Sequence, residues 1–190
     1  MIHNDEAIIH IIKIPKRIYN ELDMLDSSWK QSRVEKGFDS NVRSSKITFI
    51  AESSMTYHFC RHWVDIINAD NFKFDLYPFF ENESIQYSHY NVGDHYSWHM
   101  DIIGKLQPSE RLPPRKLSFT LMLNDDYEGG EFEIGRYFFD VNELKTETAA
   151  AENKTGTLIV FPSALPHRVK PVTKGIRKSL VGWIPGPPLR

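Results

Sequence analysis

The sequence predicts an α+β fold in which N-terminal helices support a β-rich core of the two-sheet sandwich or jelly-roll type. Two observations lead to this prediction. Apolar residues with helical spacing occur only before residue 75. After Phe74, short apolar or alternating runs follow at regular intervals, and Gly, Asn and Asp turns separate them. We expect one domain over residues 1–190, with the helical part up to about 75 and the jelly-roll core over about 76–190.

The N-terminal part combines two expected helices with two expected strands. The helices are Lys16–Trp29 and Ser54–Asn68, and the strands are Ile8–Ile14 and Ile47–Ile50. In the first helix, Ile18, Leu22 and Leu25 are spaced for one face. In the second, Ser53 or Ser54 is available as the N-cap.

The core contains six expected strands and one long loop. The strands are Ser84–Tyr90, Tyr96–Ile102, Lys116–Leu123, Glu131–Phe139, Thr157–Phe161 and Arg177–Ile184. The proline-containing segment Gly104–Arg115 is long enough by loop statistics to be functional. The polar segment Lys30–Ser45 is expected to be a second, surface loop. We expect these two loops to determine which substrate is recognised.

Composition restricts the function. Twenty-three Lys and Arg against 25 Asp and Glu give a net charge of −2, so no basic footprint for nucleic acid is present. The single cysteine, Cys60, excludes a disulfide framework and a cysteine-based zinc site. No apolar run approaches the roughly 18 residues that a membrane helix needs, and the N-terminus lacks the pattern of a signal peptide. We therefore expect a cytoplasmic protein without nucleic-acid or membrane partners; its oligomeric state is open.

The sharpest chemical signal is the pair His99-x-Asp101. In an extended strand, residues two apart project from the same face, so the imidazole and the carboxylate would lie side by side. A third ligand would come from a distant strand, and the candidate is His167, which follows the apolar run Thr157–Phe161. Two histidines and one carboxylate form the facial triad of non-heme Fe(II) oxygenases.

A basic residue stands ten positions after the second histidine. Arg177 and Ser179 share one face of an expected strand, and a guanidinium binds a carboxylate bidentately. An arginine buried without a counter-charge would cost several kcal/mol. No Asp or Glu is close to Arg177 in the sequence, so either a distant protein carboxylate or a bound dicarboxylic acid would supply the charge.

These residues together resemble the Fe(II)- and 2-oxoglutarate-dependent dioxygenases, in particular the prolyl 4-hydroxylase-like branch. The matching elements are Tyr90-x-x-Gly93-x-x-Tyr96-x-x-His99-x-Asp101, then Leu121-Met-Leu-Asn124 leading to Gly129-Gly130-Glu131-Phe132, and finally His167 through Trp183. They cover roughly residues 85 to 184 in the family's order. The resemblance implies a double-stranded β-helix whose open end holds iron on the catalytic residues His99, Asp101 and His167.

The resemblance also implies the cosubstrate site. Arg177 would bind the distal carboxylate of 2-oxoglutarate, with Ser179 beside it and the Tyr90 hydroxyl as a further contact. One departure affects this site: some members have a second tyrosine immediately before the Leu-Asn of the central strand, and here Met122 stands there. The expected cofactors and cosubstrates are Fe(II), 2-oxoglutarate and O2, with ascorbate as an added reductant.

The activity implied by the resemblance is hydroxylation of an unactivated C–H bond with release of succinate and CO2. The predicted substrate is proline, in a peptide or as a free or carrier-bound residue. Strand alternation puts Trp98 opposite His99, so Tyr96 is the predicted substrate-binding wall. Two alternatives stay open: hydroxylation of another small metabolite, and a jelly-roll binding protein without turnover. A nucleic-acid demethylase is disfavoured, because Trp183 occupies the position where those enzymes typically carry a second arginine.

Overall fold

The computed structural model describes residues 7–25, 29–32, 39, 41–77, 85–102, 113–138, 143–148 and 154–187, and gives only the backbone for 136–138 and 143–148. Residues 33–38 and 40 of the expected surface loop and 104–112 of the proline-containing loop lie outside these ranges. Among the described helices, none is both long and apolar enough to span a bilayer.

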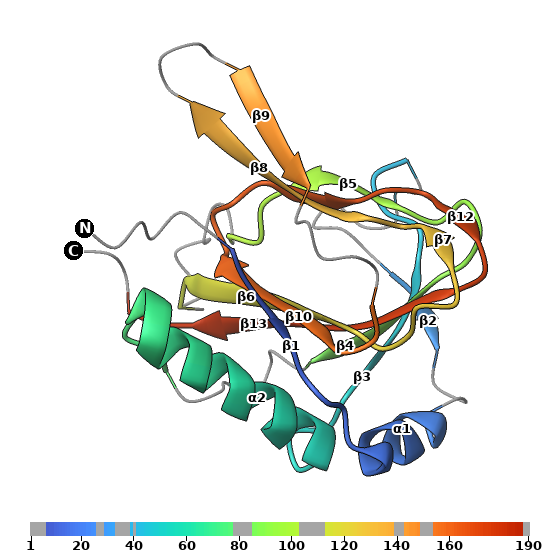
Figure 1. The fold of residues 1–190 in the computed structure, drawn as a ribbon, viewed down its shortest axis with the longest axis horizontal. Coiled ribbons are helices and arrows are strands. Elements are labelled where there is room, and N and C mark those ends of the chain that lie inside the picture. The colour runs from blue at the N-terminus through green and yellow to red at the C-terminus, as the bar shows by residue number, and fades with distance from the viewer. Residues whose placement is uncertain are drawn as a thin grey trace.

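The largest element is a seven-stranded antiparallel sheet (Figure 1). Its strands, in spatial order, are β1 (Ile8–Ile11), β10 (Thr157–Pro162), β6 (Arg115–Met122), β13 (Arg177–Pro185), β4 (Gln86–Tyr90), β3 (Lys46–Phe49) and β2 (Lys30–Gln31). The centre of the sheet therefore comes from the C-terminal half of the chain, and the N-terminal strands pair at both edges.

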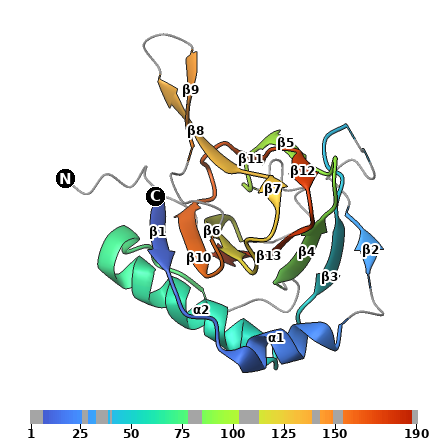
Figure 2. The same cartoon turned by 45° about the vertical axis from the view of Figure 1, so that its right-hand side comes forward.

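A second layer of strands lies across the inner face of this sheet (Figure 1). Its four-stranded part has the order β5 (Tyr96–His99), β11 (His167–Val169), β8 (Phe132–Phe138) and β9 (Glu143–Thr148), and β12 (Val172–Lys174) pairs with β7 (Glu128–Gly129). The two layers form the jelly-roll core of a double-stranded β-helix. The β8–β9 hairpin projects beyond the two layers (Figures 1 and 2).

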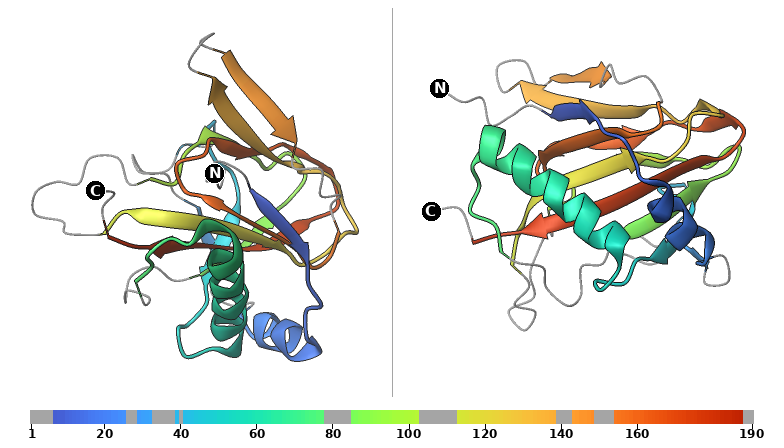
Figure 3. Two further views of the ribbon diagram at one scale, coloured as in Figure 1. Left: turned by 60° about the vertical axis from the view of Figure 1, so that its left-hand side comes forward. Right: turned by 60° about the horizontal axis from the view of Figure 1, so that its bottom comes forward.

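Two helices cover the outer face of the seven-stranded sheet (Figures 2 and 3). They are α1 (Lys16–Asp23) and α2 (Met55–Ile67), and a π-helical turn, η1 (Asn68–Phe72), continues α2. The hydroxyl of Ser54 caps α2 by accepting a hydrogen bond from the backbone N–H of Tyr57. Ile18 and Leu22 bury the apolar face of α1, as their spacing predicts.

Strand alternation divides the side chains of β6 between two environments. Leu117, Phe119 and Leu121 belong to the apolar core beneath the helices. Met122 belongs to a second apolar cluster, together with Phe132 of the opposite layer. Because residues two apart share a face, the seven-stranded sheet has one face for the supporting helices and one for the interior of the β-helix.

The structure differs from the sequence-based expectations in detail. Helix α1 ends at Asp23, six residues before the expected end, and Lys30–Gln31 is a short edge strand inside the expected surface loop. In the same segment, Arg43 and Ser45 are buried. The strand expected over Tyr96–Ile102 ends at His99, so Asp101 follows the strand instead of lying on it.

Candidate active site

Two histidines from strands far apart in sequence face each other. β11 runs antiparallel between β5 and β8, and its register places His167 directly opposite His99. Directly opposed residues project from the same face of a sheet. The imidazole ring centroids are accordingly 4.1 Å apart. Strand pairing, which depends on contacts between residues 68 positions apart in the chain, therefore brings the two rings together.

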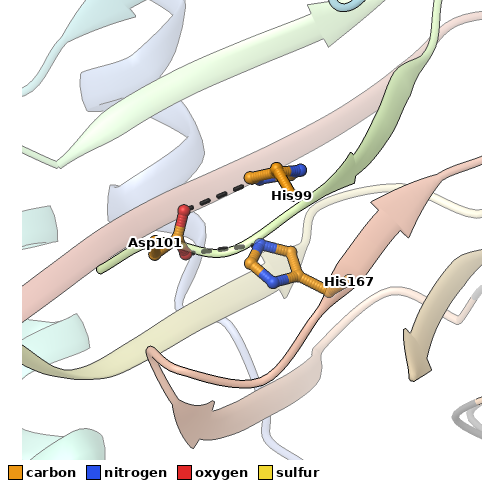
Figure 4. Close-up of side chains that lie close together, drawn as sticks. All are labelled: His99, Asp101 and His167. Atoms are coloured by element: carbon orange, nitrogen blue, oxygen red, sulfur yellow. Dashed lines mark ion pairs between the residues drawn. The ribbon is translucent and has the colours of Figure 1, made fainter. Parts of the chain in front are cut away.

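The carboxylate of Asp101 lies between the two imidazoles (Figure 4). One carboxylate oxygen is 3.6 Å from Nε2 of His99, and the other is 3.3 Å from Nε2 of His167. The chain is fixed at this point because the backbone N–H of Asp101 donates to the carbonyl of Ser163 at 2.9 Å. All three side chains are largely buried.

Hydrogen bonds and burial set the protonation of this cluster. Nδ1 of His99 lies 2.8 Å from the carbonyl of Ser97, and Nδ1 of His167 lies 2.9 Å from that of Leu165. Each Nδ1 must carry the hydrogen to make these bonds, which leaves Nε2 of both rings as the ligand atom. Burial, with His167 as the next cause, lowers the pKa of His99 to about 3. The imidazole of His99 is therefore neutral at neutral pH.

Asp101 stays ionised in spite of its burial. Burial raises the pKa of its carboxyl group, but His167, His99 and a hydrogen bond from Ser118 together hold that pKa below its ordinary value. The ligand atoms of His99, Asp101 and His167 all lie within 4.8 Å of one another. Neutral imidazoles and an ionised carboxylate are the forms that bind divalent metals, so this cluster fits a metal ion.

The cluster opens into a cavity of about 410 Å³ between the two layers, a volume that includes the space at its mouth. Apolar side chains line the wall on the metal side, namely Phe132, Phe161 and Val169. The triad therefore faces a mostly apolar space, and small-molecule sites are typically lined in this way with a few polar groups among apolar side chains.

Tyr96 reaches this cavity through a β-bulge. Regular alternation would put Tyr96 on the face of Trp98, away from His99. The register between β5 and β11 shifts, however, so that the four residues from Tyr96 to His99 oppose the three from Val169 to His167. The bulge turns Tyr96 toward His99, and their rings stack with centroids 3.5 Å apart. Trp98 contacts the guanidinium of Arg168 instead, 4.8 Å from its ring centroid.

Arg177 lines the same cavity and is almost fully buried, with 1% of its surface exposed. One terminal nitrogen donates to the Ser179 hydroxyl at 2.8 Å, and the other contacts the sulfur of Met122 at 3.1 Å. The Tyr90 ring faces the guanidinium at 5.4 Å. Nε of Arg177 has no partner among the described residues, and no described carboxylate forms an ion pair with this guanidinium.

The turn before β8 is shaped around Arg177. Gly130 has φ +65°, and a Cβ atom there would lie 3.0 Å from Cδ of Arg177, so only glycine allows this approach. The hydroxyl of Tyr127 is 4.0 Å from the sulfur of Met122. Burial raises the pKa of Tyr127 although its contact with Arg177 opposes the rise. Met122 stands where some family members have a tyrosine. Tyr127, from another segment of the chain, lies beside Met122.

The residues present fit a dicarboxylate as well as a metal. A buried guanidinium with an unpaired donor requires a counter-charge, since burial of an unpaired ion costs several kcal/mol. The structure places six of the seven sequence-predicted site residues on this cavity, namely His99, Asp101, His167, Arg177, Tyr90 and Tyr96, and puts the seventh, Ser179, against Arg177. It also places Arg43 on the cavity wall and Tyr127 beside Met122, whereas the sequence indicated only a surface loop and a turn at these two positions.

A jelly-roll core with two histidines, a carboxylate and a buried arginine on one cavity is the arrangement of a 2-oxoglutarate oxygenase. The model of the 2OG-Fe(II) oxygenase superfamily matches residues 85–185, which is more than half of the chain. The chain belongs to this superfamily.

Among curated relatives, a PKHD-type hydroxylase from Synechococcus sp. (strain CC9902) is 38% identical over 103 residues, covering 53% of this chain and 40% of that protein. A PKHD-type hydroxylase from Hyphomonas neptunium is 38% identical over 96 residues, covering 48% and 38%. The matched segment thus spans about two fifths of the length of these relatives.

Solved structures share the fold over nearly the whole chain. A prolyl-4-hydroxylase from Pseudomonas putida superposes with a TM-score of 0.66 at 20% identity, covering 97% of this chain and 94% of that one. A prolyl hydroxylase from Trichoplax adhaerens, solved with a peptide fragment of hypoxia inducible factor, gives a TM-score of 0.63 at 15% identity, covering 96% and 84%.

Proposed function

We propose that this chain is an Fe(II)- and 2-oxoglutarate-dependent hydroxylase that oxidises an unactivated C–H bond and releases succinate and CO2. The observation that carries the proposal is Arg177. Its buried guanidinium lines the same cavity as His99, Asp101 and His167, and no carboxylate among the described residues neutralises it. A metal triad and a buried carboxylate receptor on one cavity together suit a metal-bound 2-oxo dicarboxylate, whereas a simple binding module needs neither.

Each residue would have a defined task in this reaction. His99 and His167, through Nε2, and Asp101, through its carboxylate, would hold the iron, and the carbonyls of Ser97 and Leu165 would orient the two rings. Arg177 would bind the distal carboxylate of 2-oxoglutarate. Iron and 2-oxoglutarate, when bound, supply the oxidation by O2 that inserts one oxygen atom into the substrate.

The walls of the cavity would protect this chemistry from water. Phe132, Phe161 and Val169 surround the triad with apolar surface, and a dry site limits side reactions. Tyr96, which stacks on His99, would form the wall against which the substrate packs.

The proposed substrate is proline, in a peptide or as a free or carrier-bound residue, and hydroxylation of another small metabolite is the alternative. Prolyl hydroxylases are among the solved structures that share this fold. An aromatic wall at Tyr96 beside the triad suits a compact, largely apolar ring such as that of proline. Ascorbate and cytoplasmic location stay predictions.

One experiment tests the reaction class. Purified protein is supplied with iron(II), 2-oxoglutarate and air, and succinate is measured with and without proline-containing peptides and free L-proline. We expect succinate to form only when iron is present. Mass spectrometry should show that the accepted substrate gains one oxygen atom. A protein that binds iron and 2-oxoglutarate but forms no succinate would be a binding protein. Hydroxylation of an unrelated metabolite with no change to any proline compound would refute the proline assignment alone.

A further inference from the structure

A second arginine lines the cavity that holds the triad. Arg43 is only 6% exposed. The segment that carries it is tied to β5, because the backbone N–H groups of Ser44 and Ser97 donate to the carbonyls of His95 and Val42 at 3.0 and 2.8 Å. Arg43 itself forms an isolated antiparallel bridge with Tyr96. Its position beside the triad is therefore fixed by backbone pairing.

The side chain of Arg43 is held by neutral groups. Nε donates to the hydroxyl of Ser45 at 3.3 Å, and Nη2 donates to the amide oxygen of Gln86 at 3.2 Å. The guanidinium carbon lies 4.7 Å from the ring centroid of Tyr96. In the part of the chain that the structure describes, no carboxylate forms an ion pair with Arg43, and Nη1 donates no hydrogen bond. The positive charge is thus held in place, and no described carboxylate neutralises it.

Arg43 and Arg177 contact opposite ends of β4. Arg177 pairs in register with Tyr90, at the end of the strand, whereas Arg43 donates a hydrogen bond to Gln86, at its start, and four residues of a strand span roughly 13 Å. The guanidinium of Arg43 also contacts the Tyr96 ring, which stacks on His99. Arg43 is thus a separate basic group beside the triad, distinct from the arginine that would bind the distal carboxylate of 2-oxoglutarate.

The charges of the loaded site lead to the same result. An iron(II) ion and Arg177 carry three positive charges, and Asp101 and doubly ionised 2-oxoglutarate carry three negative charges. Arg43 is left over as one positive charge inside the cavity. Arg115, at the rim, is only partly buried, with its guanidinium over the Trp183 ring at 4.1 Å, so water can solvate its charge. Water has much less access to Arg43, which is 6% exposed, so a carboxylate partner would stabilise its charge more.

We infer that Arg43 binds a carboxylate of the substrate, so that the chain acts on a free amino acid, or on a residue whose carboxylate is free, in preference to a residue inside a peptide. This inference rests on the proposed function and names its substrate class. The indole N–H of Trp183, buried without a partner among the described residues, lines the same cavity. Trp183 is two residues from Val181, which pairs with Gln86, so Trp183 lies on β13 beside the end of β4 that Arg43 contacts, and its N–H is a second donor on the cavity.

The test compares acids with their amides. N-Acetyl-L-proline and N-acetyl-L-leucine are each titrated against the corresponding primary amide, with protein held in manganese(II) and 2-oxoglutarate under argon. Binding is followed by tryptophan fluorescence, which Trp183 in the cavity wall makes sensitive to occupancy. We expect at least one acid to bind about 10- to 100-fold more tightly than its amide, the range for a charge-assisted hydrogen bond.

Variants assign the preference to Arg43. Arg43→Met keeps most of the side-chain length without the charge and should abolish the difference between acid and amide. Arg43→Lys keeps the charge but not the two-pronged geometry, so the difference should shrink to a few-fold. Arg17→Met removes an exposed arginine from α1, on the helix side of the sheet, and should leave the difference intact. If Arg43→Met does not fold, Arg43→Lys decides the test, because an unchanged difference there would place the carboxylate elsewhere.

Succinate release separates this inference from the proposed function. Protein that releases succinate with iron and 2-oxoglutarate but binds acid and amide equally, or binds neither acid, would overturn the role of Arg43 and leave the oxygenase intact. Protein that releases no succinate under any condition would overturn both. A difference between acid and amide that persists in Arg43→Met would also overturn the inference.

Discussion

The two faces of the seven-stranded sheet differ in the polarity of the side chains that they carry. Toward the helices, its strands present mainly aliphatic and aromatic side chains, and these form one apolar core with residues of α1 and α2. Toward the second layer, the same strands present Ser88, Thr120, Ser179, Arg177 and Trp183 among the apolar residues. The first face is a packed core, in which burial of apolar area supplies the stability.

The inner face contains polar atoms that the fold itself does not satisfy. The Ser88 and Thr120 hydroxyls, Nε of Arg177 and the indole nitrogen of Trp183 are buried without a partner among the described residues. Three of these residues, Thr120, Arg177 and Trp183, line the cavity, where a bound molecule can supply the missing hydrogen-bond partner. The difference between the faces teaches that the helix side is mainly a packed core and that the inner side carries the candidate site.

The largest effect should come from removal of the charge between the two histidines. Asp101→Asn keeps the shape of the side chain but takes away the anionic ligand, so succinate formation should fall by about 1000-fold or more, the scale seen when one member of a catalytic unit is lost. The unfolding midpoint should fall modestly, because His167, His99 and Ser118 stabilise the ionised carboxylate in the folded protein. Succinate assay and thermal unfolding on the same sample measure both. A large loss of stability would mean that Asp101 is part of the structural core.

The opposite outcome should follow from a change on the helix side. Leu22→Ala removes a fully packed side chain of α1 and should lower the free energy of unfolding by about 2–5 kcal/mol. Succinate formation per folded molecule should stay within about twofold of the unchanged protein, since α1 does not line the cavity. Chemical denaturation gives the stability, and assay well below the unfolding temperature gives the turnover. A selective loss of turnover would contradict the separation of the two faces.

A smaller effect is expected at Arg177, the proposed contact of the cosubstrate. Arg177→Gln should raise the 2-oxoglutarate concentration for half-maximal succinate formation by about 10- to 100-fold, which corresponds to a charge-assisted hydrogen bond of about 1.5–3 kcal/mol. Ser179→Ala removes only a neutral partner of Arg177 and should raise it less than tenfold. Titration of 2-oxoglutarate at saturating iron measures both variants. An equal effect of the two changes would show that Arg177 acts through its packing and not through its charge.

How far the sequence predicts this arrangement depends on whether the signal is local. His99-x-Asp101 and Arg177-x-Ser179 are visible because two residues of one strand share a face, and the apolar spacing of α1 and α2 is equally local. The strands β11 and β12 have three residues each, which is too short for any periodicity to appear. Tyr96 faces the cavity because of a bulge, and this bulge exists only when β5 and β11 pair.

Arg43 marks the limit of sequence reasoning in this chain. It lies in a polar stretch whose composition is typical of exposed loops, and nothing near it in sequence indicates burial. Its burial results from the pairing of its backbone with Tyr96 and from its bond to Gln86, 43 residues further along the chain. Non-local contacts of this kind decide which of several basic residues become part of a site.

The smallest effect concerns the cap of the helix that covers the outer face. Ser54→Ala removes the hydroxyl that accepts a hydrogen bond from the backbone N–H of Tyr57 at 3.0 Å. Loss of an N-cap serine costs about 1 kcal/mol, so the unfolding midpoint should fall slightly while the 2-oxoglutarate dependence stays the same. Ser53→Ala, one residue earlier and exposed, is the matched control and should change neither quantity. Denaturation of the three proteins side by side measures the difference. If Ser53→Ala were the more destabilising change, α2 would begin one residue earlier than the structure places it, and the account of the helix side would need revision.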